Sequence, residues 1–325
     1  MLLGAARRVA CESRSSTPSF GDRAKDCSAL ARDSRKSACP QVFAAAERGL
    51  VRADRYRIDK EKALPRVWSD LCVALIFLTR IPLRSPAAAE PAALARAAWC
   101  FPLVGLAVGS ASLVVLSAGL WIGLPPWVAA LLGLAASLSV TGALHEDGLA
   151  DMADGFGGGW TGDRRLEIMR DSRLGSYGAI ALFLSLALRA AALAALAAAD
   201  AAVLATALLS AHVAGRALIP TVMATTPLAR RDGQSASAGQ ASCSAAAVSL
   251  FLGAGLLCLA ALPTFGDPSF VLWFVFLAVL LLALVFFAIR AVARRAIGGY
   301  TGDVLGGLEQ CGEIAVLLAA LAAIA

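Results

Sequence analysis

The sequence predicts an all-α polytopic integral membrane protein with about six to seven transmembrane helices, and three observations support this fold class. Hydrophobic residues make up 59% of the 325 residues and charged residues only 16%, whereas about a quarter of a soluble domain is charged. Apolar runs near the ~20 residues that a helix needs to cross a bilayer recur along the chain. The loops between these runs alternate between arginine-rich and arginine-free.

The first 66 residues differ from the rest of the chain. They carry 15 of the 29 Lys and Arg residues and contain no apolar run long enough to span a bilayer. Such a segment cannot bury enough apolar surface to offset the entropy lost on ordering. We therefore expect residues 1–66 to be a disordered basic and polar extension, either a membrane-surface arm or a segment without catalytic importance. Residues 67–325 are expected to form a single membrane-embedded catalytic domain.

Six apolar runs predict membrane-spanning helices in chain order. They cover residues 101–122, 127–144, 174–199, 201–223, 245–262 and 270–289. A seventh run, residues 311–325, is short. The run LCVALIFL at residues 71–78 is shorter still and is followed by Thr-Arg-Ile-Pro, which predicts a short interfacial or half-inserted helix rather than a span.

The loop charges predict an orientation. The loops after the first, third and fifth spans contain no Lys or Arg, whereas the alternate loops hold eleven arginines between Arg84 and Arg295. By the positive-inside rule, the arginine-rich loops face the cytoplasm. Arg189, His212 and Arg216 remain inside spans, where ionisable groups are candidates for function.

Two classes of function find no support in the sequence. The eight cysteines show no CxxC pairing and no nearby histidine at zinc-ligand spacing. The net charge of +6 comes largely from the N-terminal extension, and no nucleic-acid-binding motif is present. We therefore expect membrane lipid, and no nucleic acid, around the chain.

The stretch HEDGLADMADGFGGG, residues 145–159, gathers four carboxylates directly after an apolar run. Asp147, Asp151 and Asp154 have the spacing i, i+4, i+7, so they would share one face of a helix continuing from the second span. Three like charges on one face are tolerable if they bind a divalent cation, and all-oxygen ligation suits Mg²⁺. The alternative is a solvated acidic loop.

A second charged stretch, GDRRLEIMRDSRLGSYG, precedes the third span. Arg170 and Arg173 are candidates to bind phosphate oxygens, because a guanidinium group presents a fork of donors, and Asp171 is a candidate metal ligand. The alternative is a set of local ion pairs on a surface helix. The glycines at 155 and 157–159 would permit close approach to a ligand, but no G-K-[ST] sequence follows, so they form no P-loop.

A third candidate site lies near the C-terminus, in GGYTGDVLGG at residues 298–307. Asp303 stands between glycine-rich turns just before the last apolar run, and Glu309 and Glu313 follow it. The stretch is either a further charged site or a simple loop and helix start.

Seven segments resemble, in the same order, the motifs of the cobalamin synthase (adenosylcobinamide-GDP ribazoletransferase) family. They are FLTRIP (77–82), FPLVGLAVG (101–109), GALHEDGLADMADG (142–155), LEIMRDSRLGSYGAIAL (166–182), GRA (215–217), ARRDG (229–233) and GGYTGDVLGG (298–307). The resemblance runs from about residue 67 to the C-terminus. Its HxDGLxDxxDG and EIMRDSRxG elements are the most specific.

The resemblance implies a multi-pass enzyme of the bacterial inner membrane, with active-site loops facing the cytoplasm. In such an enzyme a hydroxyl of α-ribazole, or of its 5′-phosphate, attacks the phosphate attached to cobinamide in adenosylcobinamide-GDP, and GMP leaves with the help of Mg²⁺. A phosphoanhydride donor requires a metal that neutralises the charge of its pyrophosphate, and cationic contacts to the leaving group. The carboxylates would hold that metal, and the arginines would supply the contacts. The identity of the lower base, the form of the acceptor and the oligomeric state, including a homo-oligomer, stay open.

The resemblance also implies roles for individual residues. Asp147, Asp151 and Asp154 would bind the metal and diphosphate, Asp171 would be a further ligand, and Arg170, Arg173, Arg216 and Asp303 would bind substrate phosphate. His145 is either the general base for the acceptor hydroxyl or a helix-end histidine that orients a carboxylate. Glu146, Arg189 and Gln310 depart from the residues expected at their positions, and Gln310 leaves the role of Glu309 in doubt.

Two alternatives compete with this interpretation. A CDP-alcohol phosphotransferase also binds metal and nucleotide with clustered aspartates, but Asp151-x₂-Asp154-Gly155 fits only the first part of that family's pattern. A membrane carrier would use His212, Arg216 and Arg189 to line a path. Its polar residues would gather near the midplane, whereas most here lie in loops.

Removing the first 60 or so residues, the segment with the composition of a disordered chain, is expected to leave membrane insertion and turnover intact. Membrane fractionation and activity of the truncated chain check this expectation. Loss of turnover from a truncated protein that still inserts would contradict it.

Overall fold

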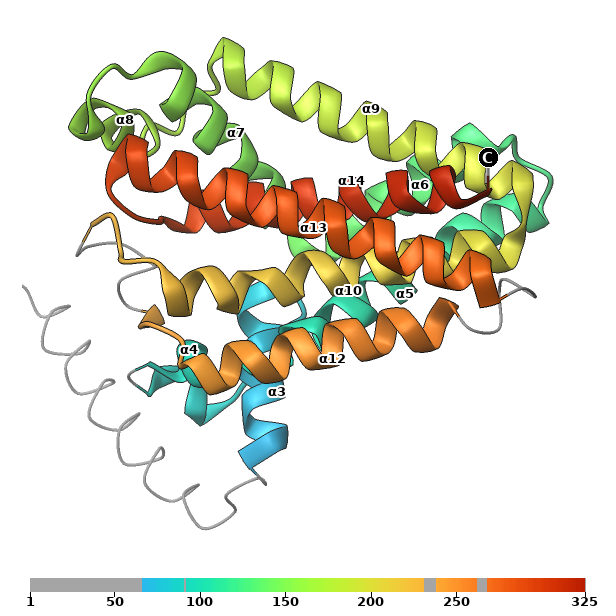
Figure 1. The fold of residues 1–325 in the computed structure, drawn as a ribbon, viewed down its shortest axis with the longest axis horizontal. Coiled ribbons are helices and arrows are strands. Elements are labelled where there is room, and N and C mark those ends of the chain that lie inside the picture. The colour runs from blue at the N-terminus through green and yellow to red at the C-terminus, as the bar shows by residue number, and fades with distance from the viewer. Residues whose placement is uncertain (1–65, 91, 231–237, 262–267, 325) are drawn as a thin grey trace, which may run out of the picture. The chain divides into compact units, whose positions relative to one another are not determined.

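The computed structural model describes residues 66–90, 92–230, 238–261 and 268–324, and this part of the chain is a helical bundle without strands (Figure 1). The predicted N-terminal extension lies outside these residues, apart from Arg66. The elements are α3 (Arg66–Leu78), η2 (Pro86–Ala89), α4 (Ala93–Ala97), η3 (Ala98–Cys100), α5 (Phe101–Trp121), α6 (Pro126–Thr141), α7 (Leu144–Gly158), α8 (Gly162–Ile168), α9 (Ser176–Ala199), α10 (Ala201–Thr225), α12 (Cys243–Ala261), α13 (Pro268–Ile297) and α14 (Gly302–Ile324).

The predicted fold class is confirmed. Within the described residues, six helical segments are long and apolar enough to cross a membrane, and a seventh is added if the bent pair α6 and α7 counts as one span. Helix α3 has 13 residues, fewer than the roughly 20 that a span requires. Its predicted position at the membrane interface stays a prediction.

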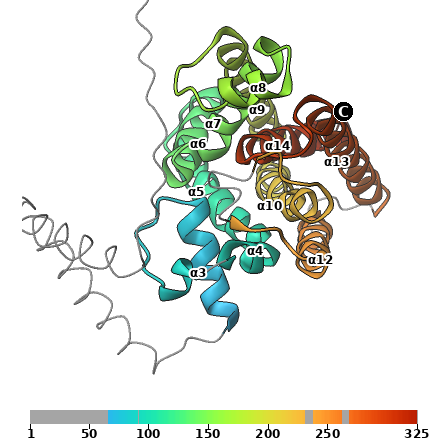
Figure 2. The same ribbon diagram turned by 90° about the vertical axis from the view of Figure 1, so that its left-hand side faces the viewer.

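Helices α10 and α14 lie at the centre of the bundle. In their most apolar windows 83% and 67% of residues are buried, against 17% in α13. Helix α10 packs against α5, α12 and α14, and α14 packs against α7, α10 and α13. Figure 2 shows this arrangement nearly end-on, with α10 and α14 inside.

The last helix differs from the prediction. The sequence suggested a short run at residues 311–325, but α14 spans 23 residues from Gly302 to Ile324. Glu309, Gln310 and Glu313 lower the apolar content of its first half, and all three are buried. They occupy the interior of a helical bundle, not a loop, because side chains of neighbouring helices pair with them.

The aspartate-bearing helix also departs from the prediction that it continues the second span. Helices α6 and α7 meet at an angle of 90°, because Gly142 and Ala143 both have left-handed backbone conformations, with φ of 68° and 59°. A Cβ atom at Gly142 would collide with the Arg80 side chain. The turn directs α7 across the end of the bundle, and its internal aspartate spacing is unchanged.

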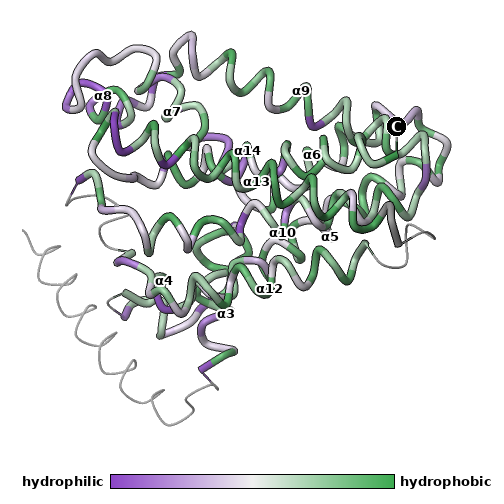
Figure 3. Tube along the Cα trace, viewed as in Figure 1, coloured by the Kyte–Doolittle hydropathy of each residue, from purple (hydrophilic) through white to green (hydrophobic). Residues whose placement is uncertain are grey.

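The loops that follow α7, α10 and α13 meet at one end of the bundle. Arg165 donates hydrogen bonds to Gly159 O at 2.9 Å and Ala296 O at 3.0 Å. Tyr300 and Ala229 pair their backbones across another pair of loops. Hydrophilic segments gather around α8 at this end, whereas α9, α12 and α13 are largely hydrophobic (Figure 3). The arginine-rich loops of the predicted cytoplasmic side include these loops.

Glycines allow α7 and α14 to cross closely. A Cβ at Gly306 would lie 2.9 Å from His145 O and 3.1 Å from Gly148 Cα. A Cβ at Gly148 would lie 3.1 Å from Asp303 Cα. Small residues at such crossings let helix backbones approach in membranes, and here they bring Asp147 and Asp303 to the same place.

Replacing Gly306 with alanine is expected to force α7 and α14 apart and to destabilise the protein by about 1–3 kcal/mol, as overpacking does. Thermal unfolding of the purified protein in detergent measures this. Gly255→Ala is the matched control, since a Cβ at Gly255 meets nothing within 4 Å. Equal melting temperatures for the two variants would contradict the close crossing.

Candidate active site

Three carboxylates from α7 and α14 converge at the crossing of these helices. Asp147 is exposed, and Asp151 and Asp303 are half-buried. Asp147, Asp303 and Asp154 all repel the carboxylate of Asp151 electrostatically, and Arg230 attracts it. The sequence predicted Asp147 and Asp151 as metal ligands, and the structure brings Asp303 close to them.

Asp303 sits in the first turn of α14, where it accepts a hydrogen bond from Thr301 Oγ1 at 3.0 Å. Arg230 Nη2 lies 3.8 Å from its Oδ2. The buried Nε and Nη1 of Arg230 have no hydrogen-bond partner among the described residues. The sequence placed Arg230 among the loop arginines and within the ARRDG segment, without a role of its own. Its unpaired donors beside a carboxylate cluster are suited to an anionic ligand.

Asp154 accepts hydrogen bonds from two backbone N–H groups. Its side chain is buried, Oδ2 accepts from Gly175 N and Oδ1 from Gly178 N, each at 2.8 Å. These donors belong to the start of α9, so the carboxylate caps that helix and favours its positive end. With both oxygens engaged, Asp154 fastens α9 to α7, and its predicted role as a metal ligand stays a prediction.

In the second charged stretch the structure forms local ion pairs. Arg164 binds Glu167 at 2.7 Å on the exposed face of α8. Arg173, whose side chain is 87% exposed, donates from Nε to Asp171 Oδ1 at 2.9 Å. This hydrogen bond lowers the pKa of Asp171 to about 2, so its carboxylate is ionised at neutral pH. The ligand role of Asp171 and the phosphate roles of Arg170 and Arg173 stay predictions.

The glycines at the end of α7 serve packing. A Cβ at Gly155 would meet the Met169 side chain at 2.7 Å, and one at Gly157 would meet the Tyr177 ring at 2.5 Å. A Cβ at Gly159 would lie 2.9 Å from backbone atoms of Arg165. These glycines allow close contact between α7 and the elements that follow it, and their predicted use in approaching a ligand stays a prediction.

A network of buried charges lies behind the carboxylates, inside the bundle. Arg189 of α9 is 1% exposed. It donates to Glu146 Oε1 of α7 and to Glu313 Oε2 of α14, each at 2.9 Å. Gln310 donates to Glu146 at 3.1 Å and to Glu309 at 2.9 Å. The network thus joins three helices.

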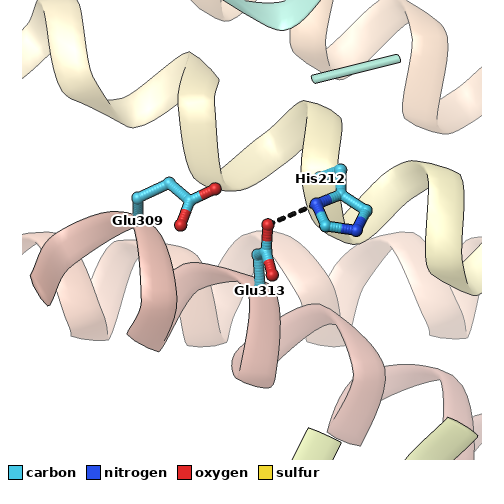
Figure 4. Close-up of side chains that lie close together, drawn as sticks. All are labelled: His212, Glu309 and Glu313. Carbon is cyan, nitrogen blue, oxygen red and sulfur yellow. Dashed lines mark ion pairs between the residues drawn. The ribbon is translucent and has the colours of Figure 1, made fainter. Parts of the chain in front are cut away.

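Arg216 of α10 is the second cation of this network. Its Nη1 contacts Glu309 Oε1 and lies 3.0 Å from Glu313 Oε1. His212 forms an ion pair with Glu313, and Figure 4 shows these two side chains facing each other with Glu309 beside them. Buried carboxylates thus engage the guanidinium group of Arg216, and its role as a phosphate contact stays a prediction.

His212, Glu309 and Glu313 offer ligand atoms that all lie within 4.8 Å of one another. Arg216 Nη1 approaches all three, including His212 Nδ1 at 3.2 Å. Its guanidinium group already supplies the positive charge at this point. A divalent cation would add charge beside it, so the buried network is better explained as a charge-compensated structural unit than as a metal centre.

A cavity of 130 Å³ lies beside Asp147 and Asp303. Its walls are Phe77, Leu78, Leu94, Phe101, Leu144, His145, Asp147, Gly148, Ile219, Met223, Ala238, Tyr300, Gly302, Asp303, Leu305 and Gly306. His145 is buried, and its Nδ1 lies 3.5 Å from Glu309 Oε2. One histidine therefore contacts the network and lines the cavity.

The sequence analysis missed Glu146, Glu309 and Glu313 as members of one network. A signal was available, because Arg189 and Arg216 inside predicted spans required counter-ions. Glu309 and Glu313 have the i, i+4 spacing that places both on one helix face.

Comparison with known proteins identifies relatives along nearly the whole described chain. The family model for cobalamin-5-phosphate synthase (CobS) matches residues 70–321. A protein of Bradyrhizobium diazoefficiens, named adenosylcobinamide-GDP ribazoletransferase, is 46% identical over 80% of this chain and 96% of its own length. Proteins of the same name from Azorhizobium caulinodans and Mesorhizobium japonicum are 45% and 42% identical. No solved structure matches the chain.

Replacing Arg189 with methionine is expected to destabilise the protein by about 3–5 kcal/mol, because it leaves the buried carboxylate of Glu146 without a cation and removes one of the basic partners of Glu313. Adding Glu146→Gln should restore part of this loss. Unfolding in detergent measures both variants, with Arg164→Met as the exposed-pair control, expected to cost under about 1 kcal/mol. If Arg189→Met and Arg164→Met are equally stable, the buried network is not what holds these helices.

Proposed function

The chain belongs to the cobalamin-5-phosphate synthase family, transferases of cobalamin nucleotide-loop assembly, and we propose that it joins adenosylcobinamide-GDP to α-ribazole or α-ribazole 5′-phosphate. Its relatives carry the name of this reaction and are matched over 95–96% of their length. This match sets aside the carrier and CDP-alcohol phosphotransferase alternatives. The observation that carries the proposal is the convergence of Asp147, Asp151 and Asp303 beside a cavity.

The reaction exchanges a phosphoanhydride linkage for a phosphate ester linkage. An acceptor ribose hydroxyl attacks the phosphorus bonded to cobinamide, a new P–O bond forms, and the bond from that phosphorus to the bridging oxygen breaks. GMP leaves with the bridging oxygen and its electron pair, and the hydroxyl proton passes to a base. Charge grows on the oxygens around phosphorus, so the site must offer compensating positive charge.

The donor set supports Mg²⁺ as the cofactor. Asp147, Asp151 and Asp303 offer only oxygen atoms, come from two crossing helices and repel one another without a cation. These three residues would hold the ion. Bound there, Mg²⁺ would neutralise the diphosphate of the donor.

Other side chains of the site have complementary tasks. Arg230 binds diphosphate oxygens through donors that have no partner among the described residues. His145 lines the cavity next to Asp147, which suits it to accept the proton of the attacking hydroxyl. Glu309, 3.5 Å from His145 Nδ1, keeps that ring oriented.

The arginine-rich loops support an orientation in which the carboxylates face the cytoplasm of a bacterial inner membrane. Large apolar side chains exposed on α9 and α13, including Phe183, Leu272 and Phe276, would then contact lipid. Both soluble substrates would reach the site from the cytoplasmic side.

Asp147→Asn and Asp151→Asn are each expected to lower turnover by at least about 100-fold, the scale of losing electrostatic stabilisation at a reacting phosphate. The assay measures GMP release from adenosylcobinamide-GDP with α-ribazole, with Mg²⁺ or with excess EDTA. EDTA should abolish release by the unaltered chain.

Asp200→Asn is the matched control. Asp200 accepts hydrogen bonds from Ala202 N and Val203 N at the start of α10, and asparagine caps helices about as well as aspartate. This variant loses the same charge away from the carboxylate cluster and should keep full turnover. Normal Mg²⁺-dependent release by Asp151→Asn would contradict the proposed site.

A further inference from the structure

Resting on the proposed function, we infer that the 130 Å³ cavity binds the aromatic base of the acceptor nucleoside, and that the Tyr300 hydroxyl donates a hydrogen bond to its free ring nitrogen. Tyr300 then helps to determine acceptor specificity. It is not a residue that the sequence analysis singled out.

The hydroxyl of Tyr300 is buried and unpaired within the described part of the chain. The residue is 1% exposed, lines the cavity, and its hydroxyl has no hydrogen-bond partner within the described part of the chain. Its backbone is fixed, since its N–H donates to Pro227 O at 2.9 Å and its carbonyl accepts from Ala229 N at 3.0 Å. An unpaired buried hydroxyl is costly, and a ligand in the cavity would satisfy it.

The size and walls of the cavity suit one ring system. A cavity of about 150 Å³ lined by apolar side chains holds a benzene molecule, whereas sites for whole drug-sized ligands are about 300–1,000 Å³. Here Phe77, Phe101, Ile219 and Met223 provide apolar and aromatic walls. A whole corrinoid or nucleoside would exceed 130 Å³, but the base alone could occupy the cavity while its ribose stays at the mouth.

The Tyr300 hydroxyl suits the acceptor's base better than the donor's. Guanine, which leaves in GMP, carries several donors and acceptors along its edge, and this hydroxyl would pair with only one of them. The benzimidazole of α-ribazole has one free acceptor nitrogen and no donor. The Tyr300 hydroxyl can donate to this nitrogen, and because burial raises the pKa of Tyr300, the hydroxyl stays protonated as a donor.

The polar edge of the cavity places the rest of the acceptor. His145, Asp147 and Asp303 line the same cavity as Tyr300. A base held against Tyr300 therefore positions its ribose beside the carboxylates, where the attacking hydroxyl is needed. A second cavity, of 630 Å³, adjoins this one through the shared walls Phe77, Leu94, Leu144 and Ala238.

The test replaces Tyr300 with phenylalanine, which keeps the ring and removes the hydroxyl. We expect the KM for α-ribazole to rise about tenfold, the effect of one lost buried hydrogen bond, with kcat at saturation and the KM for adenosylcobinamide-GDP unchanged. Tyr177→Phe is the matched control, because Tyr177 is exposed and packs against Gly157 outside the cavity.

An acceptor analogue isolates the hydrogen bond. In the indole analogue of α-ribazole, carbon replaces the free ring nitrogen. The unaltered enzyme should use it with a KM raised about tenfold, and Tyr300→Phe should bind α-ribazole and the analogue equally. Additive losses from the substitution and the analogue would show that the hydroxyl and the nitrogen do not interact, and would overturn the inference.

The design separates this inference from the proposed function. If the unaltered chain releases no GMP, the proposed function fails. The cavity is then still tested by comparing the equilibrium binding of α-ribazole to the purified unaltered protein with its binding to the Tyr300→Phe variant. If turnover is normal and Tyr300→Phe leaves the KM for α-ribazole unchanged, only the inference fails. A rise in the KM for the donor instead would also overturn it, since the cavity would then hold the donor's base.

Discussion

Arg189 and Arg216 lie inside the bundle because Glu146, Glu309 and Glu313 lie there with them. Burying an uncompensated charge would cost more than most single interactions return, so these five side chains fix one another in place. The contacts join α7, α9, α10 and α14. The positions of Asp147, Asp151 and Asp303 depend on this network, since α7 and α14 carry both the buried glutamates and these aspartates.

The network and the helix crossing act together on the site. Glu146 is held by Arg189, and the next residue along α7 is Asp147. On α14, Glu309 lies one turn after the crossing glycine Gly306 and contacts the network. Asp303 lies one turn before Gly306 and belongs to the carboxylate cluster. Rigid elements therefore set the distance between buried anchors and catalytic groups, as a site that must hold charged ligands requires. His145 lies where the two parts meet.

Local patterns in the sequence predicted the local features of this structure. The spacing of Asp147 and Asp151 indicated the right helix, and hydropathy located the spans, because both depend on neighbouring residues. The capping of α9 by Asp154 and the meeting of Asp303 with Asp147 depend on tertiary contacts, which spacing cannot reveal. Hydropathy also underestimated the length of α14, because Glu309 and Glu313 lower its apolar content. Their burial is explained only by their ion pairs with Arg189 and Arg216, which are tertiary contacts.

We propose that the carboxylates at the crossing of α7 and α14, and not the buried cluster, hold the cation that contacts the donor. Electron paramagnetic resonance of Mn²⁺ bound in place of Mg²⁺, with adenosylcobinamide-GDP present, tests it directly. The account predicts phosphorus hyperfine coupling from the diphosphate. A spectrum without phosphorus coupling, or with a histidine nitrogen coupling that disappears in His212→Ala, would contradict it.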